Sequence, residues 1–227
     1  MANAAVACVL FDLDGTLLDT EPLSDIAMQG VLDRFGKTMS WELKRKILGL
    51  KGSDWSVIVV DHFGLHGLIE PAAIVDGWET NFKQLYSRAQ KLPGADRITA
   101  HLAQLGIPMA ICTSSNSAAV ELKRAAHPEM FARCTLVVTG DDPELKNGKP
   151  SPDIFLLAAK RLGMRPEQCL VFEDALSGCQ AGVAAGMRTI VIPDTRLDRQ
   201  PFEIATEILT SLESFQPAVY GLAPFSG

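Results

Sequence analysis

The chain contains no long run of lysine and arginine, and its 227 residues carry a formal net charge of -6 at pH 7. Binding to nucleic acid or to an anionic membrane surface depends on clustered positive charge. We therefore expect neither partner, although a few local groups can still hold a small anionic substrate. The N-terminal apolar run has no basic residue before it and ends at Asp12. This run predicts neither a signal peptide nor a membrane span.

Cysteine is also scarce in the chain. The five cysteines are odd in number and form no C-x-x-C pair, so they do not indicate a disulfide framework or a redox motif. Most of them stand in apolar runs that are typical of core strands, where a free thiol packs as a small apolar side chain. Buried thiols in a reducing compartment are the favoured interpretation, and we expect a cytoplasmic protein. The five are Cys8, Cys112, Cys134, Cys169 and Cys179.

Hydrophobic residues make up 47% of the chain and charged residues 21%, which is typical of soluble globular proteins. Short apolar runs alternate with helical patterns, and this alternation predicts βαβ units with a parallel sheet of about five strands. The expected strands are 6–11, 109–113, 136–139, 169–172 and 189–192. The expected helices between them are 95–105, 117–126, 152–162 and 178–185.

The segment 21–90 differs from the rest, because it shows helical patterns without strand-like runs. A Pro-Gly break after Lys91 precedes the return of the α/β pattern. We therefore expect a Rossmann-like α/β core formed by residues 1–20 and 91–227, with helices on both faces of a parallel sheet. Residues 21–90 are predicted to form a small all-helical domain inserted after the first strand.

Two carboxylates, Asp12 and Asp14, end the first apolar run. Like charges at the end of a buried strand are unfavourable unless a cation or a reaction uses them. Residues i and i+2 of an extended chain point to the same side, and ligands of parallel α/β sheets collect beyond the carboxyl ends of the strands. Gly15 permits a sharp turn there, and Thr16 adds a hydroxyl. The pattern indicates a site at this end of the strand.

Three later segments bring further polar groups to predicted strand ends or helix starts. Residues 113–116 read Thr-Ser-Ser-Asn just before a helix, where hydroxyls and free amides form a phosphate site. Lys149 stands in a Gly-Lys-Pro turn before another helix, and a fixed ammonium can stabilise a multiply charged transition state. Glu173 and Asp174 follow a fully apolar strand.

Taken singly, each of these features also has a purely structural explanation. Acidic residues often form turns after strands, residues 113–116 can simply cap a helix, and a lone lysine is usually solvated. Glu173 and Asp174 can favour the positive end of the next helix. The functional interpretation gains its weight from the occurrence of all four segments, in order, in one α/β chain.

That arrangement resembles the haloacid dehalogenase-like hydrolase superfamily. The sequence "DLDGT" matches its first motif, Thr113 its second, Lys149 its third, and Glu173 with Asp174 its fourth. The helical segment 21–90 resembles the helical cap domain of the superfamily. The stretches "GDDPELKNGKPSPDIFLLAAKRL", "CLVFEDALSGCQAG" and "SLESFQPAVYGL" are similar to the branch that contains pseudouridine-5'-phosphatases and glycerol-phosphate phosphatases.

The resemblance implies a Mg²⁺-dependent phosphatase that acts through a covalent aspartyl phosphate. Asp12 is then the nucleophile, and Asp14 is the general acid and base. The implied phosphate-binding groups are Thr113, the Ser114 amide and Lys149. The implied Mg²⁺ ligands are a carboxylate oxygen of Asp12, the backbone carbonyl of Asp14, the side chain of Asp174, and Glu173 directly or through water.

Substrate selectivity is expected from the cap, because the core groups meet only the phosphate. Candidate cap contacts are Glu21 and, in a Gly-rich turn, Gly49 and Lys51. The expected partner is a small phosphate ester, with pseudouridine 5'-phosphate first and glycerol or sugar phosphates next. Trp55 and Asn81 are among the residues able to meet a base. A monomer or a weak dimer is expected.

Four other functions compete with the phosphatase interpretation. A dehalogenase of the same superfamily would not need Asp14, whose acid/base role belongs to phosphoryl chemistry. A phosphosugar mutase of the β-phosphoglucomutase type has the same four motifs and stays an alternative, as does a non-catalytic binding protein on the same fold. A serine hydrolase has little support, because the sequence contains no G-x-S-x-G.

Overall fold

The structure is a computed structural model that describes residues 5–50 and 52–225. The chain divides into two compact units. One unit combines the residues up to Asp19 with those from Gln90 onward, and the other spans Thr20–Ala89. The predicted insertion at 21–90 corresponds closely to the second unit, whose role as a cap stays a proposal.

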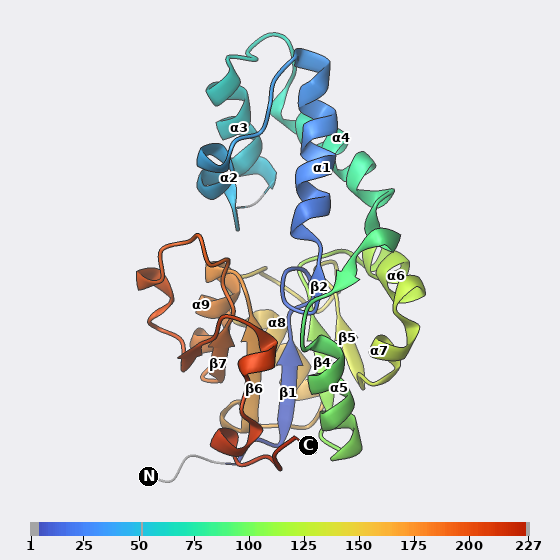
Figure 1. The fold of residues 1–227 in the computed structure, drawn as a ribbon, viewed down its shortest axis with the longest axis vertical. Coiled ribbons are helices and arrows are strands. Elements are labelled where there is room, and N and C mark those ends of the chain that lie inside the picture. Colours follow the sequence, from blue (N-terminus) through green and yellow to red (C-terminus); the bar gives the residue numbers. More distant parts are fainter. Residues whose placement is uncertain (1–4, 51, 226–227) are drawn as a thin grey trace. The chain divides into compact units, whose positions relative to one another are not determined.

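The first unit is built on a six-stranded sheet in which every neighbouring pair of strands is parallel. Figure 1 shows β1 near the middle of this sheet, between β4 and β6. The five predicted strands are all present, and the sheet gains one short edge strand that the sequence pattern did not indicate. In spatial order the strands are β5 (Leu136–Val138), β4 (Met109–Cys112), β1 (Cys8–Phe11), β6 (Cys169–Glu173), β7 (Arg188–Val191) and β8 (Glu207–Ile208).

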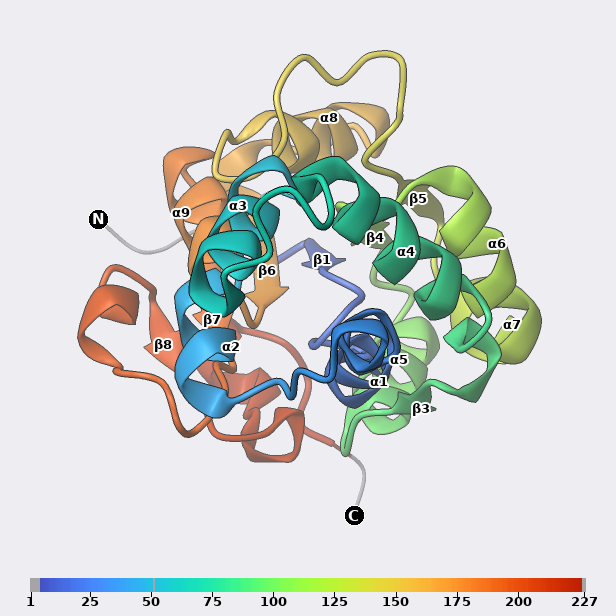
Figure 2. The ribbon, with the colours of Figure 1, turned by 90° about the horizontal axis from the view of Figure 1, so that it is seen from above.

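The central strands are buried on both sides, because helices cover both faces of the sheet. In Figure 2, α8 and α9 lie on one side of the sheet and α5 lies on the other. One core cluster joins α8 and α9 to side chains of the sheet that include Leu10 and Val171. The predicted Rossmann-like fold is confirmed. The helices are α5 (Ala95–Gln104), α6 (Ser117–Ala126), α7 (Pro128–Ala132), α8 (Asp153–Arg161) and α9 (Leu176–Ala184).

A two-stranded antiparallel ribbon marks the ends of the core segments. It pairs β2 (Leu18–Asp19) with β3 (Gln90–Lys91). The C-terminal segment forms short 3-10 turns at Leu212–Ser214 and Pro217–Tyr220. Phe215, between these turns, packs edge to face on Phe172 of β6 with ring centroids 5.0 Å apart. The C-terminal segment thus packs on the sheet through an aromatic side chain.

The second unit contains helices and connecting turns but no strand among its described residues, and it has a core of its own. Trp55 and Trp78 meet edge to face at 5.6 Å in that core. Ser40 caps the second helix by accepting a hydrogen bond from the Leu43 amide. The helices are α1 (Glu21–Leu32), α2 (Trp41–Ile47), α3 (Gly52–Phe63) and α4 (Pro71–Lys83). Among the described residues, no helix of either unit has the length and apolar character that a bilayer span requires.

Candidate active site

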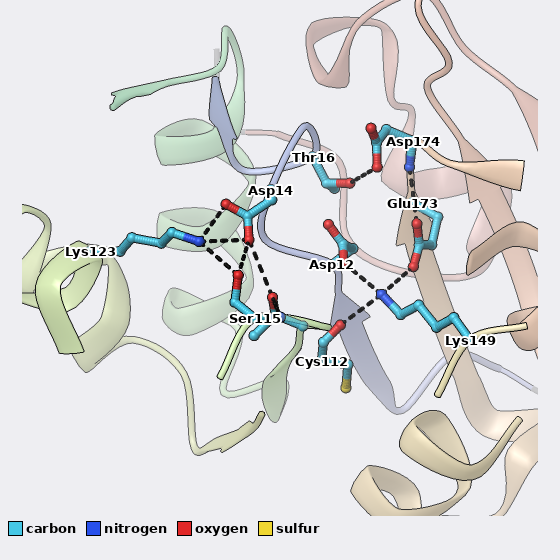
Figure 3. Close-up of polar contacts among 10 residues, drawn as sticks. Asp12, Asp14, Thr16, Cys112, Ser115, Lys123, Lys149, Glu173 and Asp174 are labelled. Atoms are coloured by element: carbon cyan, nitrogen blue, oxygen red, sulfur yellow. Dashed lines mark hydrogen bonds and ion pairs between the residues drawn. The ribbon is translucent and has the colours of Figure 1, made fainter. Parts of the chain in front are cut away.

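Asp12 lies directly beyond the carboxyl end of β1, and its amide donates to the Phe172 carbonyl of the neighbouring strand at 2.9 Å. This hydrogen bond extends the strand pairing by one residue and fixes the backbone of Asp12. In Figure 3 a dashed line joins its carboxylate to the Lys149 ammonium. Only 6% of Asp12 is exposed, so its carboxylate meets protein groups on nearly all sides.

Lys149 supplies the cation nearest to Asp12. Its ammonium lies 2.5 Å from an oxygen of Asp12, 2.5 Å from an oxygen of Glu173 and 3.0 Å from the Cys112 carbonyl (Figure 3). Burial opposes the charged ammonium, but the two carboxylates outweigh it and hold the pKa of Lys149 above its ordinary value. The side chain of Lys149 is therefore a fixed positive charge between two acids.

The structure brings together the carboxylates of Asp12, Glu173 and Asp174, which offer oxygens within 4.8 Å of one another. Burial raises the pKa of Asp12 to about 7, and the Glu173 carboxylate adds to the rise against the opposing effect of Lys149. Three acids beside one lysine leave a local excess of negative charge. Such a set of oxygen donors fits a hard divalent cation such as Mg²⁺.

The backbone of the "DLDGT" loop approaches this acidic group closely at Gly15. Gly15 has a φ of +89°, and a Cβ at this position would lie 2.2 Å from a carboxylate oxygen of Asp174. Thr16 donates a hydrogen bond of 3.4 Å to the other oxygen of Asp174. A side chain at position 15 would both strain the backbone and displace Asp174.

Asp14 lies on the same loop, but its carboxylate points to a different set of partners. It receives hydrogen bonds from the Lys123 ammonium at 2.6 and 2.7 Å, from Ser115 at 2.8 Å and from Thr113 at 3.3 Å (Figure 3). The Asp14 side chain is not one of the three carboxylates that fit a cation. The metal contact expected through its backbone carbonyl stays a prediction.

The predicted phosphate loop follows β4. Thr113 is fully buried, and its hydroxyl accepts from the Ser115 amide at 3.0 Å, so the chain bends back at this point. Ser114 is exposed next to it. Asn116 caps α6 by accepting from the Ala119 amide at 2.9 Å. The segment therefore does cap the helix. Phosphate binding by Thr113 and Ser114 stays a prediction.

Gly140 packs closely against the backbone of this loop at Ser114. A Cβ at position 140 would lie 2.2 Å from the Ser114 carbonyl oxygen, which is backbone and cannot move aside without shifting the loop. We expect Gly140→Ala to lower the stability by about 1–3 kcal/mol, as overpacking does, and to weaken substrate binding. Gly148→Ala is the matched control, since a Cβ there meets nothing within 4 Å. Urea unfolding and KM for a phosphate ester measure both effects, and equal behaviour of the two variants would contradict the assignment.

The predicted cap contacts belong to the second unit, whereas the other predicted site residues belong to the first. Glu21 begins α1, and its carboxylate lies 3.2 Å from the Lys44 ammonium, with its side chain 41% exposed. Gly49 is exposed, and Lys51 lies outside the described residues. Two residues considered for base recognition have internal roles: Trp55 is buried in the helical core, and Asn81 donates to the Ala27 carbonyl.

Sequence reasoning missed Lys123, and it placed Ser115 in the phosphate loop without its contact to Asp14. Both reach the Asp14 carboxylate, and Lys123 is fully buried. A signal was nevertheless present, because Lys123 continues the buried face that Ala119 and Val120 form on α6. A lysine on the apolar face of a helix needs an internal partner for its charge.

Comparison with known proteins agrees with this geometry. A family model for haloacid dehalogenase-like hydrolases matches residues 6–186. A probable pseudouridine-5'-phosphatase of Drosophila melanogaster is 40% identical over an alignment of 232 residues, which covers 100% of each chain. The mitochondrial (DL)-glycerol-3-phosphatase 1 of Arabidopsis thaliana is 39% identical over 226 residues, 98% of this chain and 76% of that protein.

Among solved structures, a HAD family hydrolase of Deinococcus radiodurans with bound phosphate and sodium superposes with a TM-score of 0.76 and is 27% identical. The match covers 97% of this chain and 99% of that one. The chain belongs to the haloacid dehalogenase-like hydrolase family. The predicted family is confirmed, and the predicted branch matches these relatives.

Proposed function

We propose that this hydrolase is a Mg²⁺-dependent phosphatase that cleaves a small phosphorylated metabolite through an aspartyl phosphate on Asp12. The observation that carries the proposal is the position of the Asp12 carboxylate, which lies 2.5 Å from Lys149 within a group of three carboxylates beyond β1. The phosphatase names of its relatives support the same reaction class.

In the first step, an oxygen of Asp12 attacks phosphorus and the bond to the leaving alcohol breaks. Lys149 neutralises the carboxylate as it approaches the anionic phosphate, and afterwards stabilises the negative charge on the transferring group. Thr113 and the Ser114 amide bind other phosphate oxygens. Asp14, in its protonated form, gives its proton to the departing alkoxide, so the products are the alcohol and the aspartyl phosphate.

In the second step, water attacks the phosphorus of the aspartyl phosphate. Asp14, now ionised, takes a proton from that water, and the bond between phosphorus and the Asp12 oxygen breaks to restore the free carboxylate and release inorganic phosphate. Asp12, Glu173 and Asp174 would hold the Mg²⁺, together with the Asp14 backbone carbonyl. When bound, the ion supplies positive charge that offsets the crowded acids and the phosphate.

The proposed substrate is pseudouridine 5'-phosphate or a related sugar or polyol phosphate, and the helical unit Thr20–Ala89 is the proposed cap that selects it. The names of the Drosophila and Arabidopsis relatives support this range of substrates. The cytoplasmic location and the monomeric or weakly dimeric state stay predictions.

Removal of the metal is expected to abolish phosphate release, and added Mg²⁺ to restore it. Asp174→Asn weakens one of the three acidic ligands, so we expect it to raise the Mg²⁺ concentration for half-maximal activity about tenfold or more. Asp198→Asn is the matched control, because Asp198 is exposed and is not one of the three clustered carboxylates. Full activity of the intact protein in excess EDTA would contradict the metal dependence.

A panel of phosphorylated metabolites tests the substrate and the reaction class together. We expect the intact protein to release inorganic phosphate from one of them with a clear preference for a nucleoside, sugar or polyol ester. Formation of an isomeric phosphate ester without phosphate release would instead indicate a phosphosugar mutase. If the protein catalyses neither reaction with any ester of the panel, the result would favour the non-catalytic alternative.

A further inference from the structure

Lys123 is the most deeply buried charged side chain close to the site, with 0% exposure on α6. Its ammonium has three acceptors for its three protons, namely both oxygens of Asp14 and the Ser115 hydroxyl at 2.9 Å. Ser115 in turn donates to Asp14 at 2.8 Å. Figure 3 shows Lys123 reaching this pair from α6, on the opposite side of Asp14 from Lys149.

Stability alone does not explain a lysine at this position. Taking an ammonium out of water is unfavourable, and replacing a buried ion pair by apolar side chains is often neutral or stabilising. The remainder of the same helix face is apolar, with Ala119 and Val120 buried beside it. Methionine or leucine at position 123 would suit that face without any desolvated charge.

The contacts fix the direction of one particular carboxylate. Asp14 follows β1 on a loop, and 26% of its side chain is exposed, so its own backbone does not restrict it to one rotamer. Lys123 and Ser115 contact it through short hydrogen bonds that come from α6 and from the turn before that helix. The acid that must meet the leaving oxygen is therefore held from a second, rigid element of the core.

We propose that Lys123 is a positioning residue for Asp14, which together with Ser115 holds the Asp14 carboxylate in the orientation needed for proton transfer to the leaving alcohol. This inference rests on the proposed phosphatase function, and it adds a residue outside the four motifs. Lys123 acts through Asp14 and does not itself contact the phosphate.

A dependence on the leaving group separates positioning from a merely structural role. An alkoxide is a poor leaving group and needs a proton from Asp14, whereas p-nitrophenolate leaves readily without one. The value of kcat/KM reports the steps up to loss of the alcohol. A smaller folded fraction, in contrast, lowers kcat/KM for both esters by the same factor.

The experiment compares kcat/KM for the best alkyl phosphate of the panel with that for p-nitrophenyl phosphate in the presence of Mg²⁺. For Lys123→Met we expect the loss with the alkyl ester to exceed the loss with the aryl ester by about tenfold or more, since general acid catalysis contributes about 10²–10⁴-fold. Ser115→Ala is expected to show the same pattern with a smaller ratio. Lys160→Met, at an exposed lysine of α8, is the matched control.

A double variant tests whether the effect passes through Asp14. When Asp14→Asn is already present, adding Lys123→Met should leave the ratio of the two esters unchanged. Equal losses for both esters in Lys123→Met, or no loss, would overturn the inference while leaving the phosphatase function intact. Failure of the intact protein to hydrolyse either ester would overturn the proposed function and this inference with it.

Discussion

Asp12→Asn is expected to lower phosphate release by about four orders of magnitude or more, because the amide oxygen is a far weaker nucleophile than the carboxylate. The substitution keeps the shape of the side chain, and the Lys149 ammonium retains Glu173 at 2.5 Å. The fold should therefore persist, and substrate binding should change much less than turnover. Steady-state phosphate release and equilibrium binding of a phosphate ester measure the two effects separately.

Asp198→Asn is the matched control for this variant, since it makes the same change of carboxylate to amide at an exposed position. Its turnover should equal that of the intact protein. If Asp12→Asn kept more than a small fraction of the activity in a preparation free of deamidated protein, Asp12 would not be the nucleophile. The three clustered carboxylates would then serve metal binding alone.

Lys149→Met is expected to have the second largest effect, with a loss in kcat of about 10²–10³-fold, as is typical when one fixed group that stabilises the transition state is removed. Lys149 also separates Asp12 from Glu173, and its own side chain is only 6% exposed. Breaking a buried ion pair from one side destabilises a protein by about 3–5 kcal/mol. Thermal unfolding and single-turnover kinetics test both parts.

Mg²⁺ should partly compensate for the missing ammonium, since both cations offset the same acids. We therefore expect Mg²⁺ to raise the Tm of Lys149→Met by more than it raises that of the intact protein. Lys160→Met provides the control at an exposed lysine. A Lys149→Met protein with unchanged stability and equal Mg²⁺ response would show that Lys149 does not balance the acidic group.

Much of the fold could be predicted from the sequence, because short apolar runs and helical periods report burial directly. The strand ending at Phe11 and the helix at 117–126 were located within a few residues of their observed bounds. The edge strand Glu207–Ile208 was missed because two residues carry no periodic pattern. The pairing of Leu18–Asp19 with Gln90–Lys91 was missed for another reason, since it joins segments far apart in the chain.

The site shows the same division between local pattern and tertiary contact. Asp12, Lys149 and Asp174 could be found because each stands in a recognisable motif at a strand end or turn, and the structure brings the first two into contact. Lys123 belongs to no motif, and its role depends on where α6 packs against the "DLDGT" loop. The distinction between an exposed and a buried lysine on α6 comes from that packing.

Trapping the covalent intermediate tests the central claim most directly. Rapid acid quenching during turnover of the best substrate, followed by borohydride reduction, converts an aspartyl phosphate to homoserine, which peptide mass spectrometry locates. The account predicts homoserine at position 12, dependent on both substrate and Mg²⁺, and none in Asp12→Asn. Rapid phosphate release by the intact protein, with homoserine at another aspartate and none at position 12, would contradict it.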